Sequence, residues 1–256
     1  MTASHLHTWL GLLEAACAQV STTNLDIIID QAGSETPLLP SVRSVVPQMP
    51  WQSLFAGLPE AGLEDLAPLL VRVDLAQPMQ RQWLIGLMSE LDGRAQLLTL
   101  ASLWPFQVLA EHFGRCLDAV NGGCPGLLRY YDPRLFPLLF SHVLQPEQQA
   151  LWLRPVVFWS WLDRDGAPQR LLGDADAADS ANVSEPVELS DSQVETLGCA
   201  SDATLAMANL SAAFPQAWGA EQRFQACYAA MLEATQAGLL TDAQREAFVL
   251  DRLRKA

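Results

Sequence analysis

The hydrophobic residues of this chain change their spacing along its length, and that change limits the folds it can adopt. Apolar residues recur at helical spacing in residues 4–20 and 81–91. Between these segments, residues 24–30 hold three consecutive isoleucines, and residues 69–75 alternate apolar with charged side chains, as strands do. Alternating strand-like and helix-like segments are typical of a sheet that is flanked by helices.

Further segments continue this pattern as far as residue 163. Strands are predicted at residues 95–102, 127–131 and 156–161. Between the first two, a helix is predicted from Pro105 to Val120, because proline favours the first helical position and a glycine pair follows the last apolar residue. Residues 1–163 are therefore predicted to form an α/β lobe, with a mixed sheet and flanking helices.

The pattern weakens after residue 163. Residues 164–189 show little hydrophobic periodicity, and the wider stretch 171–222 holds nine acidic residues and no basic one. Charged segments without an apolar face have little to bury. Residues 164–189 are therefore predicted to be an acidic linker or loop.

The last segment has a purely helical pattern. Ser190 with Gln193, and Thr241 with Gln244, match the capping box, in which two side chains satisfy free backbone amides at the start of a helix. The apolar residues between the two boxes keep helical spacing. Residues 190–256 are therefore predicted to be a smaller, all-helical lobe of about three helices.

The charge balance excludes two classes of partner. The chain has 29 acidic against 15 basic residues, a formal net charge of −14. Such a charge repels phosphate groups, so neither nucleic acid nor an anionic membrane surface is expected as a partner. The five cysteines are scattered and lack CxxC spacing, which favours reduced thiols. The first residues lack the basic start of a secretion signal, and we expect a cytoplasmic location.

Motifs for catalysis or cofactor binding are absent from the sequence. There is no GxSxG elbow, P-loop, HExxH motif or GxGxxG fingerprint with an acidic partner. Asp30 ends a predicted strand, where doubly wound folds often place catalytic carboxylates, but strand termination and amide capping are the favoured roles. We therefore expect no enzyme activity, no catalytic residue, no cofactor and no metal site.

A corner at residues 129–134 is the most unusual local string. Asp132 precedes Pro133, which favours a helix start with the aspartate capping free amides and the proline in the first helical position. Arg129 and Arg134 flank the aspartate, so an ion pair is expected to hold the corner. The favoured role of the corner is structural, and the alternative is contact with a partner.

Aromatic and arginine side chains supply the candidate partner contacts. Three tryptophans gather near the end of the first lobe, and tryptophan, tyrosine and arginine are the residues most enriched at interface hot spots. Clustered tryptophans are more often core residues, which is the alternative here. The candidate partner-binding residues are Trp104, Tyr131, Arg134, Trp159 and Trp161.

The order of several short motifs resembles the domain of unknown function 4123. The motifs are LFAG at 54–57, LAPLLV at 66–71 followed by Asp74, Trp83-Leu84, RYYDPR at 129–134, and QPEQ at 145–148 before Pro155-Val156. Asp30, after its aliphatic run, also matches the opening segment of that family, and the resemblance covers roughly residues 24–163. Residues 93–96 depart from it, since Gly-Arg-Ala-Gln stands where the family commonly has a Ser-Trp-Gly type segment.

The resemblance implies an adaptor or chaperone of the bacterial type VI secretion system. Such proteins bind a toxic effector in the cytoplasm and load it onto the VgrG spike, so the expected partners are a cognate effector and VgrG. The family fold is implied to be an α/β lobe joined to a helical lobe. Two other functions stay open. One is an immunity protein that neutralises a toxin; the other is a small hydrolase that uses Asp30 and Asp132, against which the missing nucleophile motif argues.

The two lobes are expected to have different functions. Residues 24–163 carry the motifs of the resemblance, so they are expected to serve the shared function, and cargo choice is expected to reside in residues 190–256 or in a groove between the lobes. The alternative is that the last helices only cover the sheet of the first lobe.

Overall fold

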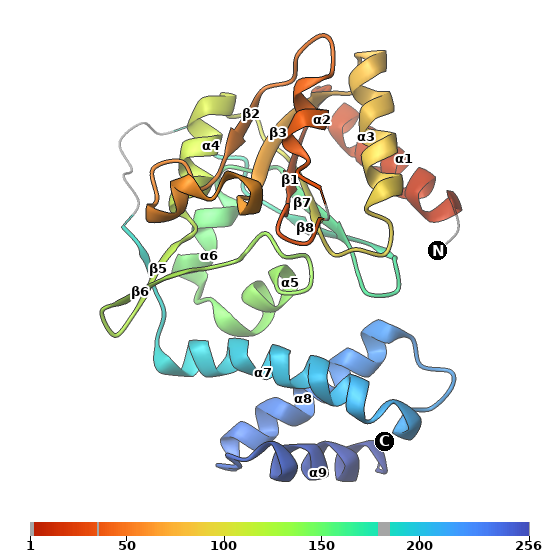
Figure 1. The fold of residues 1–256 in the computed structure, drawn as a ribbon, viewed down its shortest axis with the longest axis vertical. Helices are drawn as coiled ribbons and strands as arrows, with labels where there is room; N and C mark the ends of the chain where they lie inside the picture. The colour runs from red at the N-terminus through yellow and green to blue at the C-terminus, as the bar shows by residue number, and fades with distance from the viewer. Residues whose placement is uncertain (1–2, 35, 179–184, 256) are drawn as a thin grey trace.

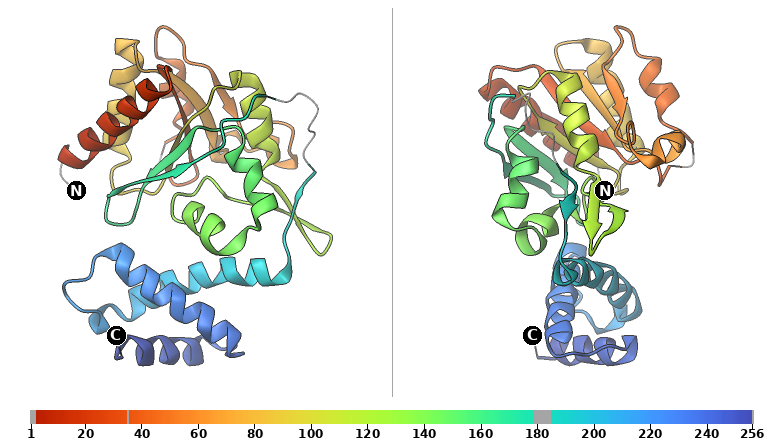
Figure 2. Two further views of the ribbon diagram at one scale, coloured as in Figure 1. Left: turned by 180° about the vertical axis from the view of Figure 1, so that it is seen from behind. Right: turned by 90° about the vertical axis from the view of Figure 1, so that its left-hand side faces the viewer.

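The computed structural model describes residues 3–34, 36–178 and 185–255, and it has two lobes (Figure 1). An α/β lobe holds a six-stranded sheet with helices, and a smaller lobe of helices lies at one end of the molecule (Figure 2). The predicted fold class is confirmed.

The main sheet has the strand order β2-β3-β1-β4-β7-β8, and every neighbouring pair in it is antiparallel. Its strands are β1 (Asn24–Ile29), β2 (Trp51–Ser53), β3 (Leu69–Asp74), β4 (Leu97–Ala101), β7 (Phe158–Leu162) and β8 (Pro168–Leu172). The isoleucine run lies in β1, between β3 and β4, because β-branched side chains suit a strand that is covered on both faces. The parallel pairing that a mixed sheet requires lies in a second, smaller sheet.

Helices cover both faces of the main sheet. Ile27 and Ile29 face a core that also holds side chains of α1 (Ala3–Gln19), α2 (Leu39–Arg43) and α3 (Pro78–Glu90). Ile28 faces a core built with α4 (Phe106–Arg115), α5 (Phe136–Leu138), its π-helical continuation η3 (Leu139–Val143), and α6 (Pro146–Leu153). Since successive strand side chains point to opposite faces, one apolar run fills both cores.

The predicted helix 105–120 and strand 127–131 are corrected by the smaller sheet. Helix α4 ends at Arg115, and the chain then forms a hairpin of β5 (Asp118–Asn121) and β6 (Cys124–Leu127), with β9 (Val187–Glu188) beside β5. Gly122 and Gly123 have φ of 54° and 82°, so they form the hairpin turn and do not end a helix. The apolar spacing up to Val120 resembled a helical stripe because β5 follows the helix almost directly.

Part of the predicted linker 164–189 belongs to the sheet. Strand β8 pairs with β7 over five residue pairs, from Phe158 with Leu172 to Leu162 with Pro168. Strand β8 is at the edge of the sheet and pairs with a neighbour on one side only. Its Arg170 and Leu172 are exposed, so the segment lacks strong apolar alternation. Residues 179–184 of the predicted linker lie outside the described residues. Short 3-10 turns, η1 (Pro59–Gly62) and η2 (Glu64–Leu66), precede β3.

The helical lobe consists of α7 (Asp191–Asn209), the short turn η4 (Ser211–Ala213), α8 (Ala220–Gln236) and α9 (Asp242–Leu253). Both predicted capping boxes are present, at the starts of α7 and α9. These helices enclose a core of their own around Phe224 and Tyr228, to which the α/β lobe contributes Leu138. The helices therefore pack beside α5 and η3, and the alternative that they cover the sheet is wrong.

Candidate functional site

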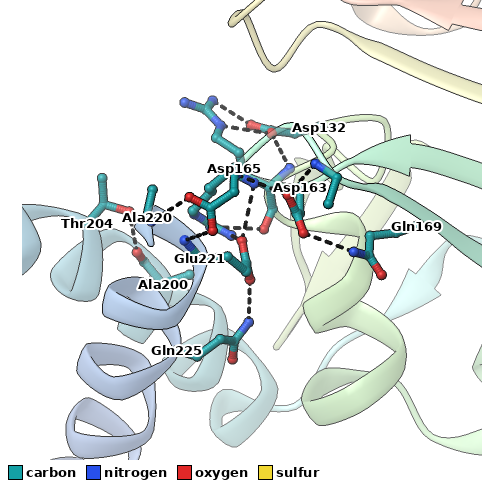
Figure 3. Close-up of polar contacts among 12 residues, drawn as sticks. Asp132, Asp163, Asp165, Gln169, Ala200, Thr204, Ala220, Glu221 and Gln225 are labelled. Atoms are coloured by element: carbon teal, nitrogen blue, oxygen red, sulfur yellow. Dashed lines mark hydrogen bonds and ion pairs between the residues drawn. The ribbon is translucent and has the colours of Figure 1, made fainter. Parts of the chain in front are cut away.

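The tip of the β7–β8 hairpin joins the two lobes. The carboxylate of Asp165 accepts hydrogen bonds from the backbone amides of Ala220, at 2.6 Å, and Glu221, at 3.1 Å (Figure 3). These are free amides of the first turn of α8, which a negative group stabilises. Gly219 precedes them, and a Cβ there would lie 2.5 Å from the Asp165 carboxylate. The cap of α8 thus comes from the other lobe.

Arg164 strengthens this joint. Its Nη1 lies 2.9 Å from Glu221 Oε2, and its guanidinium carbon lies 3.3 Å from the centroid of the Phe224 ring. The other oxygen of Glu221 accepts from Gln225 Nε2 at 2.7 Å (Figure 3). An arginine that combines an ion pair with an aromatic face at a mostly buried position holds its neighbours in a defined geometry.

A second joint lies at the start of α7. Gln193 Nε2 donates to Val143 O and to Gln148 Oε1, both at 2.7 Å, and the same side chain completes the capping box with Ser190. The ring of His142, on η3, stands edge-on to Tyr228 of α8 with centroids 5.2 Å apart. The lobes are therefore connected by specific contacts at the hairpin tip and around η3, besides the chain itself.

A groove of about 620 Å³ lies between the lobes, beside the hairpin joint. Its apolar lining includes Leu6, Met88, Leu91, Trp161 and Met207. Its charged lining comprises Asp92, Arg94, Arg134, Asp163, Arg164 and Glu221. Since α1, α3, the turn before β4, the β7–β8 hairpin, α7 and α8 all contribute, the groove depends on the folded arrangement of both lobes. It is the candidate functional site.

The candidate contacts divide between the groove and the core. Arg134 and Trp161 line the groove, although Trp161 is largely covered. Trp159 has no exposed surface and donates its indole N–H to Trp152 O, so a partner could not reach it in this structure. Trp104 and Tyr131 are also buried: Trp104 donates to Asp176 O, and the Tyr131 ring lies beneath the guanidinium of Arg129.

The corner at residues 129–134 contains two separate ion pairs. Asp132 accepts from the backbone amide of Arg134 at 2.9 Å and from its guanidinium at 2.7 and 3.0 Å. Arg129 pairs instead with Asp30, at 2.9 Å, so it joins the corner to the end of β1. Helix α5 starts only at Phe136. The predicted helix cap is therefore a turn cap, because two further residues separate Pro133 from the helix.

Three buried cysteines and one partly buried histidine are held in their neutral forms. Burial raises the pKa of the Cys17 and Cys227 thiols to about 11 and that of Cys116 to about 12, so these cysteines are protonated at neutral pH. Burial also lowers the pKa of His112, whose ring nitrogen bonds to Leu151 O at 2.6 Å. Within the part of the chain that the structure describes, no three histidine, cysteine, aspartate or glutamate side chains gather as metal ligands do.

Several groove residues could not be found from the sequence. The cap of α8 lies 55 residues before the helix it caps, and Gly219 at the N-cap position carries no capping side chain. Arg94 and Asp92 lie in a turn whose only local signal is Gly93, with φ of 74°. Which side chains face the groove depends on how the lobes dock, which no short-range pattern encodes.

The chain is a two-lobed α/β protein with a groove between its α/β lobe and its helical lobe. Residues 27–150 match the model of the family described as "Domain of unknown function (DUF4123)", and this match supports the DUF4123 family for the α/β lobe. The matched segment runs from β1 into α6 and includes the Arg94 turn and the corner at 129–134. No curated protein and no solved structure is significantly similar to the chain. No helix in the described residues is long and apolar enough to cross a bilayer.

Proposed function

We propose that this protein is an adaptor, or chaperone, of a bacterial type VI secretion system. In this role it binds a toxic effector protein in the cytoplasm and loads it onto the VgrG spike. The observation that carries the proposal is the DUF4123 match over residues 27–150, together with the ordered motifs that extend it to residue 163.

The groove supports a binding role for this family domain. Its lining comes from both lobes, so a cargo segment that lies there contacts the matched domain and the helical lobe together. An apolar surface rimmed by charged groups is typical of sites that take up another protein. The matched segment then serves the function shared with the family, and the helical lobe adds contacts of its own.

The carboxylates that a hydrolase would use are engaged in ion pairs. Asp30 accepts from Arg129 with one oxygen and from the amide of Ala32 with the other, at 2.9 and 3.0 Å. Both oxygens of Asp132 are held by Arg134. Carboxylates fixed in this way stabilise a fold, and a general base needs a free lone pair near its substrate. This favours a non-enzymatic function.

The test is to purify the full chain with an affinity tag from the bacterium that encodes it, and to identify proteins that are retained in stoichiometric amount. We expect a toxin and, with it or separately, a VgrG protein. The activity of the captured toxin is then measured with and without an excess of the chain. An adaptor leaves the toxin active, whereas inhibition by the excess chain would make the protein an immunity protein and overturn the proposal.

A further inference from the structure

The charged groups of the groove are not equivalent. Arg134 is neutralised by Asp132 and Arg164 by Glu221, at 2.7 and 2.9 Å. Arg94, the third arginine of the lining, is exposed and has no ion pair or side-chain hydrogen bond with any residue that the structure describes. An unpaired guanidinium that faces a groove, in a chain of net charge −14, is a local exception to the charge of the molecule.

The turn that carries Arg94 also contains an unpaired acceptor. Asp92 Oδ1 is covered from solvent and has no hydrogen-bond partner among the described residues. Both side chains line the groove, with Gly93 between them in the left-handed region. A covered acceptor without a partner is unfavourable, and it gains a donor from a bound molecule only if the turn shifts to expose it. The turn therefore presents an exposed, unpaired guanidinium, while the acceptor beside it stays covered.

The rest of the lining is suited to apolar side chains. Met88 and Met207 stand on the two lobes, and methionine adapts its shape to varied neighbours. Arg94 is exposed at the rim, whereas sites for small molecules usually gather their polar groups inside the pocket. An exposed guanidinium at the rim of an apolar groove matches a peptide, whose apolar side chains fit the groove and whose acidic side chains pair with arginine.

We propose that the groove binds a linear segment of the cargo that has apolar side chains and at least one aspartate or glutamate, whose carboxylate pairs with Arg94. This inference rests on the proposed adaptor function and specifies the chemistry of its cargo. The acidic surface outside the groove repels acidic segments, so Arg94 directs the segment to the groove. The pairing with Arg94 also fixes which residues of the segment lie in the groove.

The probes are short overlapping peptides that tile the toxin retained in the purification described above, measured by fluorescence anisotropy against the full chain. We expect binding by a peptide with an acidic residue among apolar ones, weakened about tenfold when that residue becomes Gln. Arg94→Gln should weaken the same peptide to a similar extent, and the two changes together should add little. Arg254→Gln, which removes an exposed arginine outside the groove lining, is the matched control.

A filled groove gives an independent readout. Ala95→Trp places a large side chain in the lining and should abolish peptide binding, while thermal melting shows whether the variant is folded. If it does not fold, Arg94→Gln, which breaks no contact, still decides the question.

Binding that is indifferent to Arg94 and to the acidic residue would overturn the inference. So would the absence of peptide binding while the whole toxin is still retained, or occupation of the groove by a small molecule or a second copy of the chain. In each of these cases the adaptor function can stand, whereas failure to retain any toxin removes the proposed function itself.

Discussion

At the residue scale, the structure assigns partners that short-range patterns cannot. The sequence predicted an ion pair at the corner 129–134, and Asp132 and Arg134 form one. It could not predict that Arg129 reaches Asp30, 99 positions away, because that contact depends on where the corner docks against β1. Tertiary docking also decides which tryptophan reaches the groove. Trp159 and Trp161 are two positions apart on one strand, and only Trp161 lines the groove.

The turn cap at Asp132 gives the first prediction. Asp132→Ala removes three hydrogen bonds to Arg134 and should lower the free energy of unfolding by about 1 kcal/mol, as cap losses do. Asp132→Asn retains an acceptor for the backbone amide and should lose less. Urea unfolding of both variants measures the difference. Equal stability of the alanine variant and the natural chain would show that the cap is unimportant.

His112 gives a prediction about pH. Burial lowers its pKa below the ordinary value of 6.5, so the unfolded chain binds the proton first as the pH falls. The free energy of unfolding is therefore unaffected by this group above pH 6.5. It decreases as the pH drops from there towards the lower pKa of His112 in the folded state. The free energy of unfolding should fall by at most about 1.4 kcal/mol per pH unit from this group.

Melting temperatures between about pH 7.5 and about pH 5.5 test this. His112→Gln keeps a donor for Leu151 O but does not titrate, so its melting temperature should change less over that range. A variant with the same pH dependence as the natural chain would contradict the assignment to His112.

At the scale of elements, prediction succeeded where the signal is local. Strands β1 and β3, helix α3 and the two capping boxes follow from apolar period and end residues within a few positions. It failed at β5, β6 and β8, which are short and contain one buried residue, Ala119, so burial leaves little mark on their sequences. Their pairing depends on neighbours that lie elsewhere in the chain.

Helix α8 yields the prediction at this scale. Asp165→Ala removes the acceptor of two amides in its first turn and should lower the free energy of unfolding by about 1 kcal/mol. Asp174→Ala removes an exposed carboxylate of the same chain region and should change stability by less than about 0.5 kcal/mol. Thermal or urea unfolding compares the two. A loss no larger for Asp165 than for Asp174 would mean that the joint between hairpin and α8 does not stabilise the molecule.

At the scale of the whole molecule, the sequence predicted two lobes but not how they meet. Composition and period separate residues 1–163 from 190–256, and the structure keeps that division apart from β8 and β9. The groove arises from the docking of the lobes through Leu138, Gln193 and Asp165. Those contacts join residues far apart in the chain. The sequence therefore indicated a groove between the lobes but not the residues that line it.

Truncation tests the independence of the α/β lobe. A chain that ends at residue 178 retains β8 and should stay folded, with reduced stability because Leu138 loses its cover. A chain that ends at Asp163 also lacks β8, which leaves β7 as an unprotected edge, and it should aggregate. Circular dichroism and size-exclusion chromatography compare them. Equal behaviour of the two would show that β8 is dispensable for the sheet.

In the proposed function, the chain delivers a cargo for secretion. The most direct measurement is the amount of the retained toxin that cells secrete when the gene for this chain is deleted, with and without a plasmid that restores it. We expect secretion of that toxin to be lost on deletion and restored by the natural chain. The VgrG protein should still be exported, and the cells should need no protection from the toxin. Unchanged secretion together with self-poisoning of the deleted cells would contradict the proposed function and identify an immunity protein.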